Sequence, residues 1–101
     1  MKLSSLATVL CLAVAAGTTS AQDQNLARNL AASCANCHNT DGKAVPNTGM
    51  VSLAGIQRVQ LLQNIKEFKS GVKPATIMHQ IAKGYSDEQM DLIAAYFAAQ
   101  K

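Results

Sequence analysis

The chain has 101 residues, of which 49% are hydrophobic and 15% are charged. The length allows one small domain, and the composition excludes an intrinsically disordered chain. The net charge of +3 is too weak and too scattered to predict nucleic-acid binding. Aromatic residues make up only 4% and tryptophan is absent, so little material is available for a hydrophobic core.

Residues 1–21 have the pattern of a cleaved signal peptide, although a buried N-terminal helix is an alternative. Lys2 gives a positive start, an uncharged run extends from Leu6 to Ala16, and small residues lead up to Ala21. This run is about half of the roughly 20 residues that cross a bilayer, so we expect no stable membrane insertion. The sequence therefore predicts export to the periplasm and a mature domain over residues 22–101.

A mature chain of this length buries too little apolar surface to be stable without a disulfide, a metal or a cofactor. Its only two cysteines lie in the segment Cys34–His38, which has the C-x-x-C-H pattern of covalent c-type haem attachment. Two thiols three positions apart on a helical turn can each bond one haem vinyl group, and His38 can then reach the iron. A thioredoxin-like dithiol, a zinc site and a plain disulfide are the alternatives, and each fits the surrounding sequence less well.

As an iron ligand, His38 needs a hydrogen-bond acceptor for its second ring nitrogen. Pro46 offers a carbonyl downstream, although a proline that only stiffens the loop fits the spacing better. The candidates for the sixth ligand of the iron are Met50, Met78, Met90 and His79. Met78 has the most suitable distance from His38, with His79 as its direct rival.

The apolar spacing predicts an all-α fold with about four helices packed around one haem. We expect helices over Asn25–Cys34, Val59–Ser70, Ala75–Lys83 and Asp87–Gln100, and a loop over Asn39–Gly55. Gly71 should end the second helix, and Ser86 with Gln89 should form a capping box at the start of the last one. Met90 falls on the apolar face of that last helix, which favours a core position.

These features together resemble class I c-type cytochromes. The resemblance rests on Cys34–His38, Pro46-Asn47, Ser52–Gly55 and the ending Leu92–Phe97, and it covers the mature chain. It implies that haem c is attached at Cys34 and Cys37, that His38 and Met78 are the axial ligands, and that the Pro46 carbonyl accepts from His38.

The segments Phe68–Gly71, Thr76–Met78 and Gln80–Ser86 are more narrowly similar to the cytochrome subunit of flavocytochrome c sulfide dehydrogenase, whereas His79 departs from its pattern. This resemblance implies a subunit that is not catalytic by itself. It would accept electrons from the FAD of a flavoprotein partner and pass them to a soluble electron acceptor. A diffusible cytochrome that shuttles between respiratory complexes is the main alternative, and a haem sensor or peroxidase is a weaker one.

Lysines could guide the docking of an acidic partner. Lys66, Lys69 and Lys73 cluster near the end of the second expected helix, and we expect Lys43 and Lys83 nearer the haem edge. Lysines in a last turn also complement the helix dipole, so this pattern does not separate the two roles.

Overall fold

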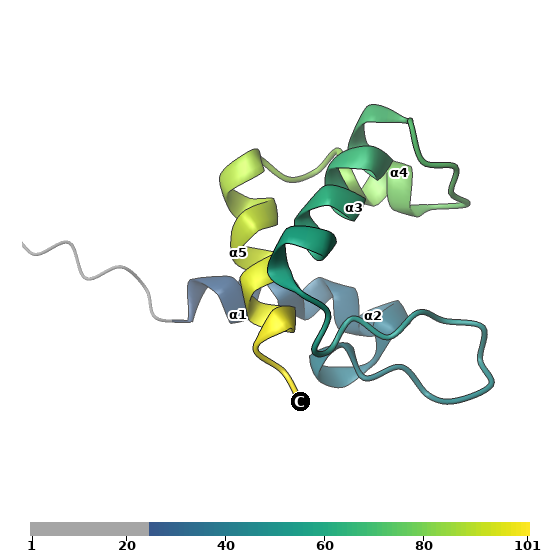
Figure 1. The fold of residues 1–101 in the computed structure, drawn as a ribbon, viewed down its shortest axis with the longest axis vertical. Coiled ribbons are helices and arrows are strands. Elements are labelled where there is room, and N and C mark those ends of the chain that lie inside the picture. The colour runs from purple at the N-terminus through teal and green to yellow at the C-terminus, as the bar shows by residue number, and fades with distance from the viewer. Residues whose placement is uncertain (1–24) are drawn as a thin grey trace, which may run out of the picture.

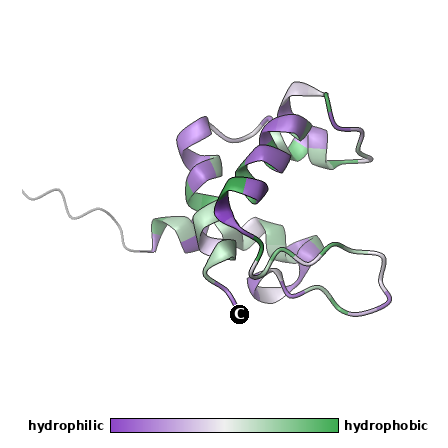
Figure 2. Ribbon diagram, in the orientation of Figure 1, coloured by the Kyte–Doolittle hydropathy of each residue, from purple (hydrophilic) through white to green (hydrophobic). Residues whose placement is uncertain are grey.

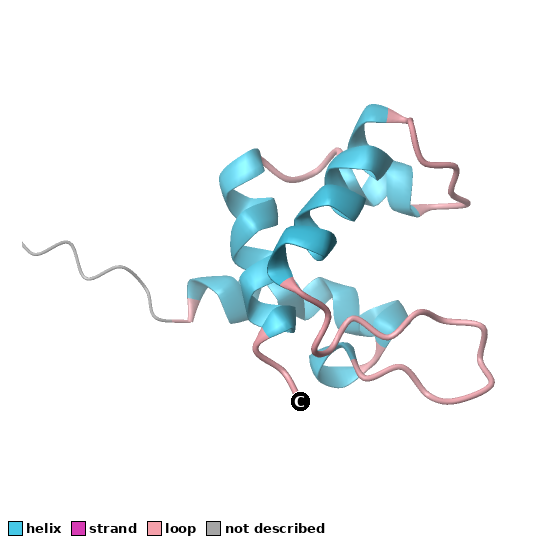
Figure 3. Ribbon diagram, in the orientation of Figure 1, coloured by secondary structure: helices cyan, strands magenta, loops and turns pink. Residues whose placement is uncertain are grey.

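The computed structural model describes residues 25–101, so the expected signal peptide over residues 1–21 lies outside the described part. Within it, all regular structure is helical and no strand is present, which confirms the all-α prediction (Figure 3). None of the described helices is both long enough and apolar enough to cross a membrane. The helices are α1 (Leu26–Ala31), η1 (Ala32–Cys34), α2 (Ala35–His38), η2 (Thr40–Gly42), α3 (Arg58–Ser70), α4 (Met78–Ala82) and α5 (Asp87–Ala98).

The expected helices are present, with shifted boundaries. The first continues past Cys34 to His38, because η1 joins α1 to α2 with helical backbone angles throughout. The third is shorter than expected and begins only at Met78, because the backbone of Ile77 is not helical, with φ of −139°. The loop prediction for residues 39–55 missed the short turn η2.

Local signals set the helix ends that the sequence predicted. Gly71 ends α3 with φ of +83°, a left-handed conformation that glycine adopts without steric cost. Ser86 and Gln89 form the capping box of α5: the Gln89 N–H donates to Ser86 Oγ at 3.2 Å, and the Ser86 N–H donates to Gln89 Oε1 at 2.9 Å. Both predictions are confirmed.

The hydrophobic core lies where α1 and α3 pack on α5, while α4 packs on α3 (Figure 1). Met90 is fully buried, as its position on the apolar face of α5 predicted. Next to Phe97, the Tyr96 ring meets it edge-on, with 5.3 Å between ring centroids. The core cluster consists of Ala31, Leu61, Ile93, Ala94 and Phe97.

Gly42 brings the loop after α2 into contact with this core. Its φ is +74°, and a Cβ built on it would lie 2.7 Å from Cδ1 of Phe97 and 2.9 Å from Cβ of Leu53. Only glycine fits such a close approach at a left-handed angle. The N–H of Gly55 also donates to the Phe97 carbonyl at 3.0 Å, so α5 holds both ends of the segment 42–55.

The outer face of α3 is polar and nearly free of ion pairs. Gln60 donates to Asn64 and Gln63 donates to Glu67, each four residues along the helix. Within residues 25–101 the structure shows one ion pair, in which Arg58 holds Asp91 through two hydrogen bonds. These bonds to Arg58 lower the pKa of the exposed Asp91 carboxyl below its ordinary value.

On the side away from the core, two arms project from the helices (Figure 1). The first arm is α2 with the loop that follows it, and the second is α4 with the segment 71–77 that leads into it. Both arms carry exposed apolar side chains, several of which colour the loops green in Figure 2. They are Val45, Met50 and Val51 on the first arm and Val72, Ile77 and Ile81 on the second.

Candidate haem-binding site

The two cysteines of the C-x-x-C-H motif lie on one helical turn of the first arm. Cys34 ends η1 and Cys37 lies in α2, so a spacing of three places both thiols on the same side. Both are free, but their surroundings differ: Cys34 is half-buried against the core and Cys37 is exposed. Burial raises the pKa of the Cys34 thiol above its ordinary value. The helical turn thus presents two unpaired thiols, as attachment to two vinyl groups requires.

His38 is the last residue of α2, and its ring is already oriented. Its Nδ1 lies 2.7 Å from the carbonyl oxygen of Val51. A carbonyl can only accept, so Nδ1 is the donor, and in the neutral ring Nε2 then keeps its lone pair. This tautomer leaves Nε2 available to bind a metal ion, while the backbone fixes the plane of the ring.

The acceptor differs from the Pro46 carbonyl that the resemblance implied: the structure pairs His38 with Val51. The reason is the return path of the loop. The Gly42 carbonyl accepts from Leu53 N at 2.7 Å, from Ala54 N at 3.2 Å and from Ser52 Oγ at 2.9 Å. These three bonds place the preceding residue, Val51, next to His38. Pro46 lies in an exposed turn further out, and counting residues along the sequence could not choose between the two carbonyls.

The candidates for the sixth ligand separate in the structure. Met90 is fully buried in the core, which leaves it unavailable. Met50 belongs to the same arm as His38 and is 42% exposed. Met78 and His79 are the first two residues of α4, on the opposite arm, and both are half-buried. Nδ1 of His79 is buried without a hydrogen-bond partner, a feature that the sequence did not reveal.

The apolar surface of the two arms fits a haem. Soluble proteins seldom leave such side chains gathered on one side unless a ligand or partner covers them. Here Val51 is 63% exposed beside His38, and Ile77 is 53% exposed beside Met78. A hollow of about 240 Å³ also lies next to Cys37, lined in part by Val45 and Met50. A large apolar ring held at the cysteines would bury part of this surface.

Two of the five lysines considered for docking are held by internal contacts. Lys69 Nζ donates to the Tyr85 carbonyl at 2.6 Å. Lys73 Nζ donates to Asn64 Oδ1 at 3.1 Å and lies over the Phe68 ring, 5.3 Å from its centroid. These contacts assign the two lysines to the packing around α3. Lys43, Lys66 and Lys83 are exposed.

Comparison with known proteins shows which family the chain belongs to. The cytochrome c family model matches residues 24–101, and the chain belongs to the cytochrome c family. Its function is therefore electron transfer, and the family implies haem c at the C-x-x-C-H motif.

The proteins similar to the chain include a cytochrome subunit, an electron acceptor and a cytochrome c4. It is 38% identical over 68 residues to the cytochrome subunit of sulfide dehydrogenase of Chlorobaculum tepidum, which covers 67% of this chain and 60% of that protein. It is 37% identical over 76 residues to the thiosulfate dehydrogenase electron acceptor of Stutzerimonas stutzeri, covering 75% of this chain and 35% of that protein. Cytochrome c4 of Pseudomonas aeruginosa is 37% identical over 71 residues, covering 70% and 35%. The chain thus matches about a third to three-fifths of the length of these relatives.

Proposed function

We propose that the protein is the haem-bearing subunit of a sulfide dehydrogenase. It accepts electrons from the FAD of a flavoprotein partner and passes them to a soluble acceptor in the periplasm. The observation that carries the proposal is the similarity to the cytochrome subunit of sulfide dehydrogenase over 67% of the chain. Val72, which is 76% exposed on the second arm, supports it, because a permanent subunit interface is more apolar than a transient one.

In this proposal, residues of both arms hold one haem. Cys34 and Cys37 would attach it covalently, and Nε2 of His38 and the sulfur of Met78 would bind its iron. When bound, the haem supplies a one-electron couple between ferric and ferrous iron. The Val51 carbonyl holds the His38 ring in place, so little rearrangement accompanies each electron.

The flavoprotein partnership is tested by gel filtration of the native protein in high salt. We expect co-elution with an FAD-containing chain. Val72 is 76% exposed near one end of α3 and Val59 is 79% exposed at the other end, so they form a matched pair. Val72→Asp should abolish co-elution, and Val59→Asp should leave it intact. Elution of the wild-type protein alone in high salt would overturn the proposal.

A diffusible electron shuttle is the second candidate, because the similar proteins also include cytochromes named without a partner enzyme. One is cytochrome c-554(548) of Halomonas halodenitrificans, 35% identical over 75 residues, which cover 67% of this chain and 84% of that protein. A shuttle needs a small, salt-sensitive contact so that it can leave. Electron transfer that slows steeply with ionic strength, without any stable complex, would favour this candidate.

The choice of Met78 is tested separately by absorption spectroscopy. A methionine-ligated ferric haem has a weak band in the far-red region, and Met78→Ala should abolish it. His79→Ala and Met50→Ala should keep the band. A wild-type spectrum without the band, or a band that survives in Met78→Ala and is lost in Met50→Ala, would show that the ligand is assigned to the wrong residue.

Export is tested by the mass of the mature protein. The periplasmic fraction should contain a chain that starts near Gln22 and carries one covalently bound haem that resists acid–acetone extraction. A cytoplasmic protein that keeps residues 1–21 would contradict the periplasmic location.

A further inference from the structure

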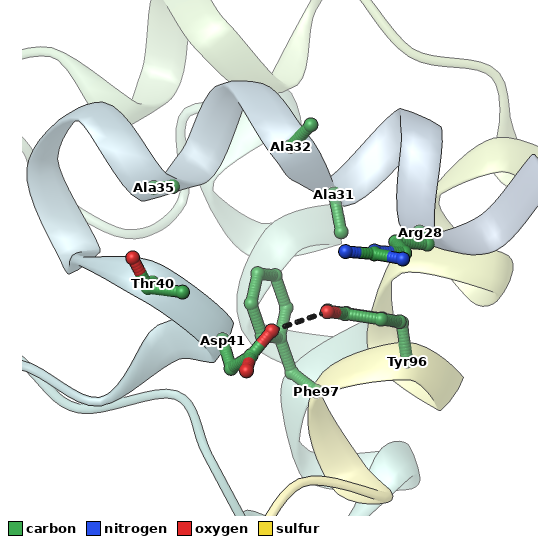
Figure 4. A pocket seen from close by; sticks show the side chains of 8 residues that line it. All are labelled: Arg28, Ala31, Ala32, Ala35, Thr40, Asp41, Tyr96 and Phe97. Carbon is green, nitrogen blue, oxygen red and sulfur yellow. Dashed lines mark hydrogen bonds between the residues drawn. The ribbon is translucent and has the colours of Figure 1, made fainter. Parts of the chain in front are cut away.

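A contact between α5 and the loop after the haem motif bridges the two ends of the domain. The hydroxyl of Tyr96 donates to Oδ1 of Asp41 at 2.5 Å, across 55 residues of sequence. Figure 4 shows the Tyr96 hydroxyl pointing at the Asp41 carboxylate, below the alanines of α1 and η1; these residues line a hollow of about 180 Å³. Asp41 has φ of +56°, which is rare outside glycine, asparagine and aspartate. The long-range hydrogen bond from Tyr96 therefore stabilises an uncommon backbone conformation at Asp41.

This contact is connected to His38, the expected iron ligand, through Gly42 and Val51. Gly42 follows Asp41, and its carbonyl accepts all three bonds that hold residues 52–54. The preceding residue, Val51, supplies the acceptor for Nδ1 of His38. The position of the Gly42 carbonyl therefore sets the position of the Val51 carbonyl. Tyr96 on the last helix thus helps to hold the Gly42 carbonyl in place, and the Gly42 carbonyl in turn positions the Val51 carbonyl.

The surroundings favour a protonated Tyr96 hydroxyl that donates. The hydrogen bond to Asp41 raises the pKa of Tyr96, and the Arg28 guanidinium nearby opposes this more weakly. Figure 4 shows Arg28 beside the hydroxyl, on the side away from Asp41. The hydroxyl of Tyr85, the other tyrosine, pairs instead with Ser33 Oγ at 2.7 Å.

We propose that Tyr96 is a positioning residue for the haem iron ligand: through Asp41 and the Gly42 carbonyl it holds the Val51 carbonyl on Nδ1 of His38. The proposal rests on haem ligation by His38, and it adds a residue more than fifty positions away to the control of that ligand. A weaker bond at Nδ1 makes the imidazole a poorer electron donor to the metal, so the reduction potential should rise when the contact is lost.

The test compares three variants of the haem-loaded protein: Tyr96→Phe, the control Tyr85→Phe, and Asp41→Asn. The asparagine keeps an acceptor oxygen and tolerates the left-handed angle. Mass spectrometry first establishes that haem is attached in all three. Proton exchange is then followed by NMR at Nδ1 of His38 and at the amides of Leu53 and Ala54.

We expect exchange at these three sites to speed up by about tenfold in Tyr96→Phe and to stay near wild type in the other two. The reduction potential should rise only in Tyr96→Phe. Equal exchange rates in Tyr96→Phe and Tyr85→Phe would overturn the proposal, and so would faster exchange spread evenly over the whole domain. Loss of haem from the wild-type protein under acid–acetone would instead overturn the proposed function on which this inference rests.

Discussion

The core side and the arm side of this small domain differ in how they bury their apolar residues. Where α1 and α3 pack on α5, Phe97 and Ile93 are 2% and 3% exposed and Met90 is fully buried. On the two arms, Val51 and Ile77 remain more than half exposed. On the core side, protein atoms alone bury the apolar side chains. The arm side presents exposed apolar side chains and the oriented ring of His38. The comparison indicates that the chain folds around its last helix and leaves the remaining burial to the haem.

Removing the haem attachment should have the largest effect. The double variant Cys34→Ala/Cys37→Ala should carry no covalent haem and lose most of its folded structure, because the core side alone is too small to be stable. Far-ultraviolet circular dichroism and the mass of the chain report both changes. Asn36→Ala, between the two cysteines, is the control and should keep haem and helices. A fully helical, cooperatively unfolding double variant would show that the core side suffices.

Gly42→Ala should give the next largest effect, because it forces a Cβ against Phe97 where the loop joins the core side. We expect a loss of about 4 kcal/mol in the free energy of unfolding, from backbone strain and overpacking together. Gly49 has the same φ of +74° but no atom within 4 Å of a Cβ. Gly49→Ala should therefore cost only about 1 kcal/mol, the strain alone. Denaturant unfolding of the two variants measures the difference, and equal losses would remove the packing argument.

A pair of methionines tests the contrast between the sides directly. Met90→Ala should destabilise the protein by about 3 kcal/mol, since it empties a fully buried position. Met50→Ala should cost less than about 1 kcal/mol, because Met50 is 42% exposed. Similar losses in denaturant unfolding would mean that the bound haem buries Met50 as completely as the core buries Met90.

The smallest effect is expected at high pH. Since the bond to Asp41 raises the pKa of Tyr96, its phenol should ionise above the ordinary value of about 10. The contribution of this bond to stability is fully present below that ordinary value and is lost as the pH rises through the raised pKa. Ultraviolet titration in a Tyr85→Phe background isolates Tyr96. Ionisation below pH 10 would contradict this assignment.

Sequence reasoning succeeded where the signal is local. The capping box at Ser86, the stop at Gly71 and the core position of Met90 depend on residues within one or two helical turns, and all three are confirmed. The motif Cys34–His38 likewise indicates its chemistry by its own spacing, and the family match supports haem c there.

The contacts that the sequence did not predict are long-range. The acceptor of His38 is Val51, thirteen residues away, because three hydrogen bonds to the Gly42 carbonyl determine the path of the loop. The bond from Tyr96 to Asp41 needs a left-handed backbone at Asp41 and the packing of α5, and neither has a sequence pattern of its own. In both cases the contact depends on which atoms the tertiary structure brings together, and residue spacing does not predict that.

The scarcity of ion pairs in the described residues makes salt a selective probe of association. Hydrogen bonds between neutral amides, such as Gln60 to Asn64, change little with ionic strength, whereas contacts between opposite charges weaken. With Arg58 and Asp91 as the one ion pair of the described chain, and an exposed one, added salt should scarcely change folding. A salt-dependent rate measured on this protein therefore reports how it meets another molecule.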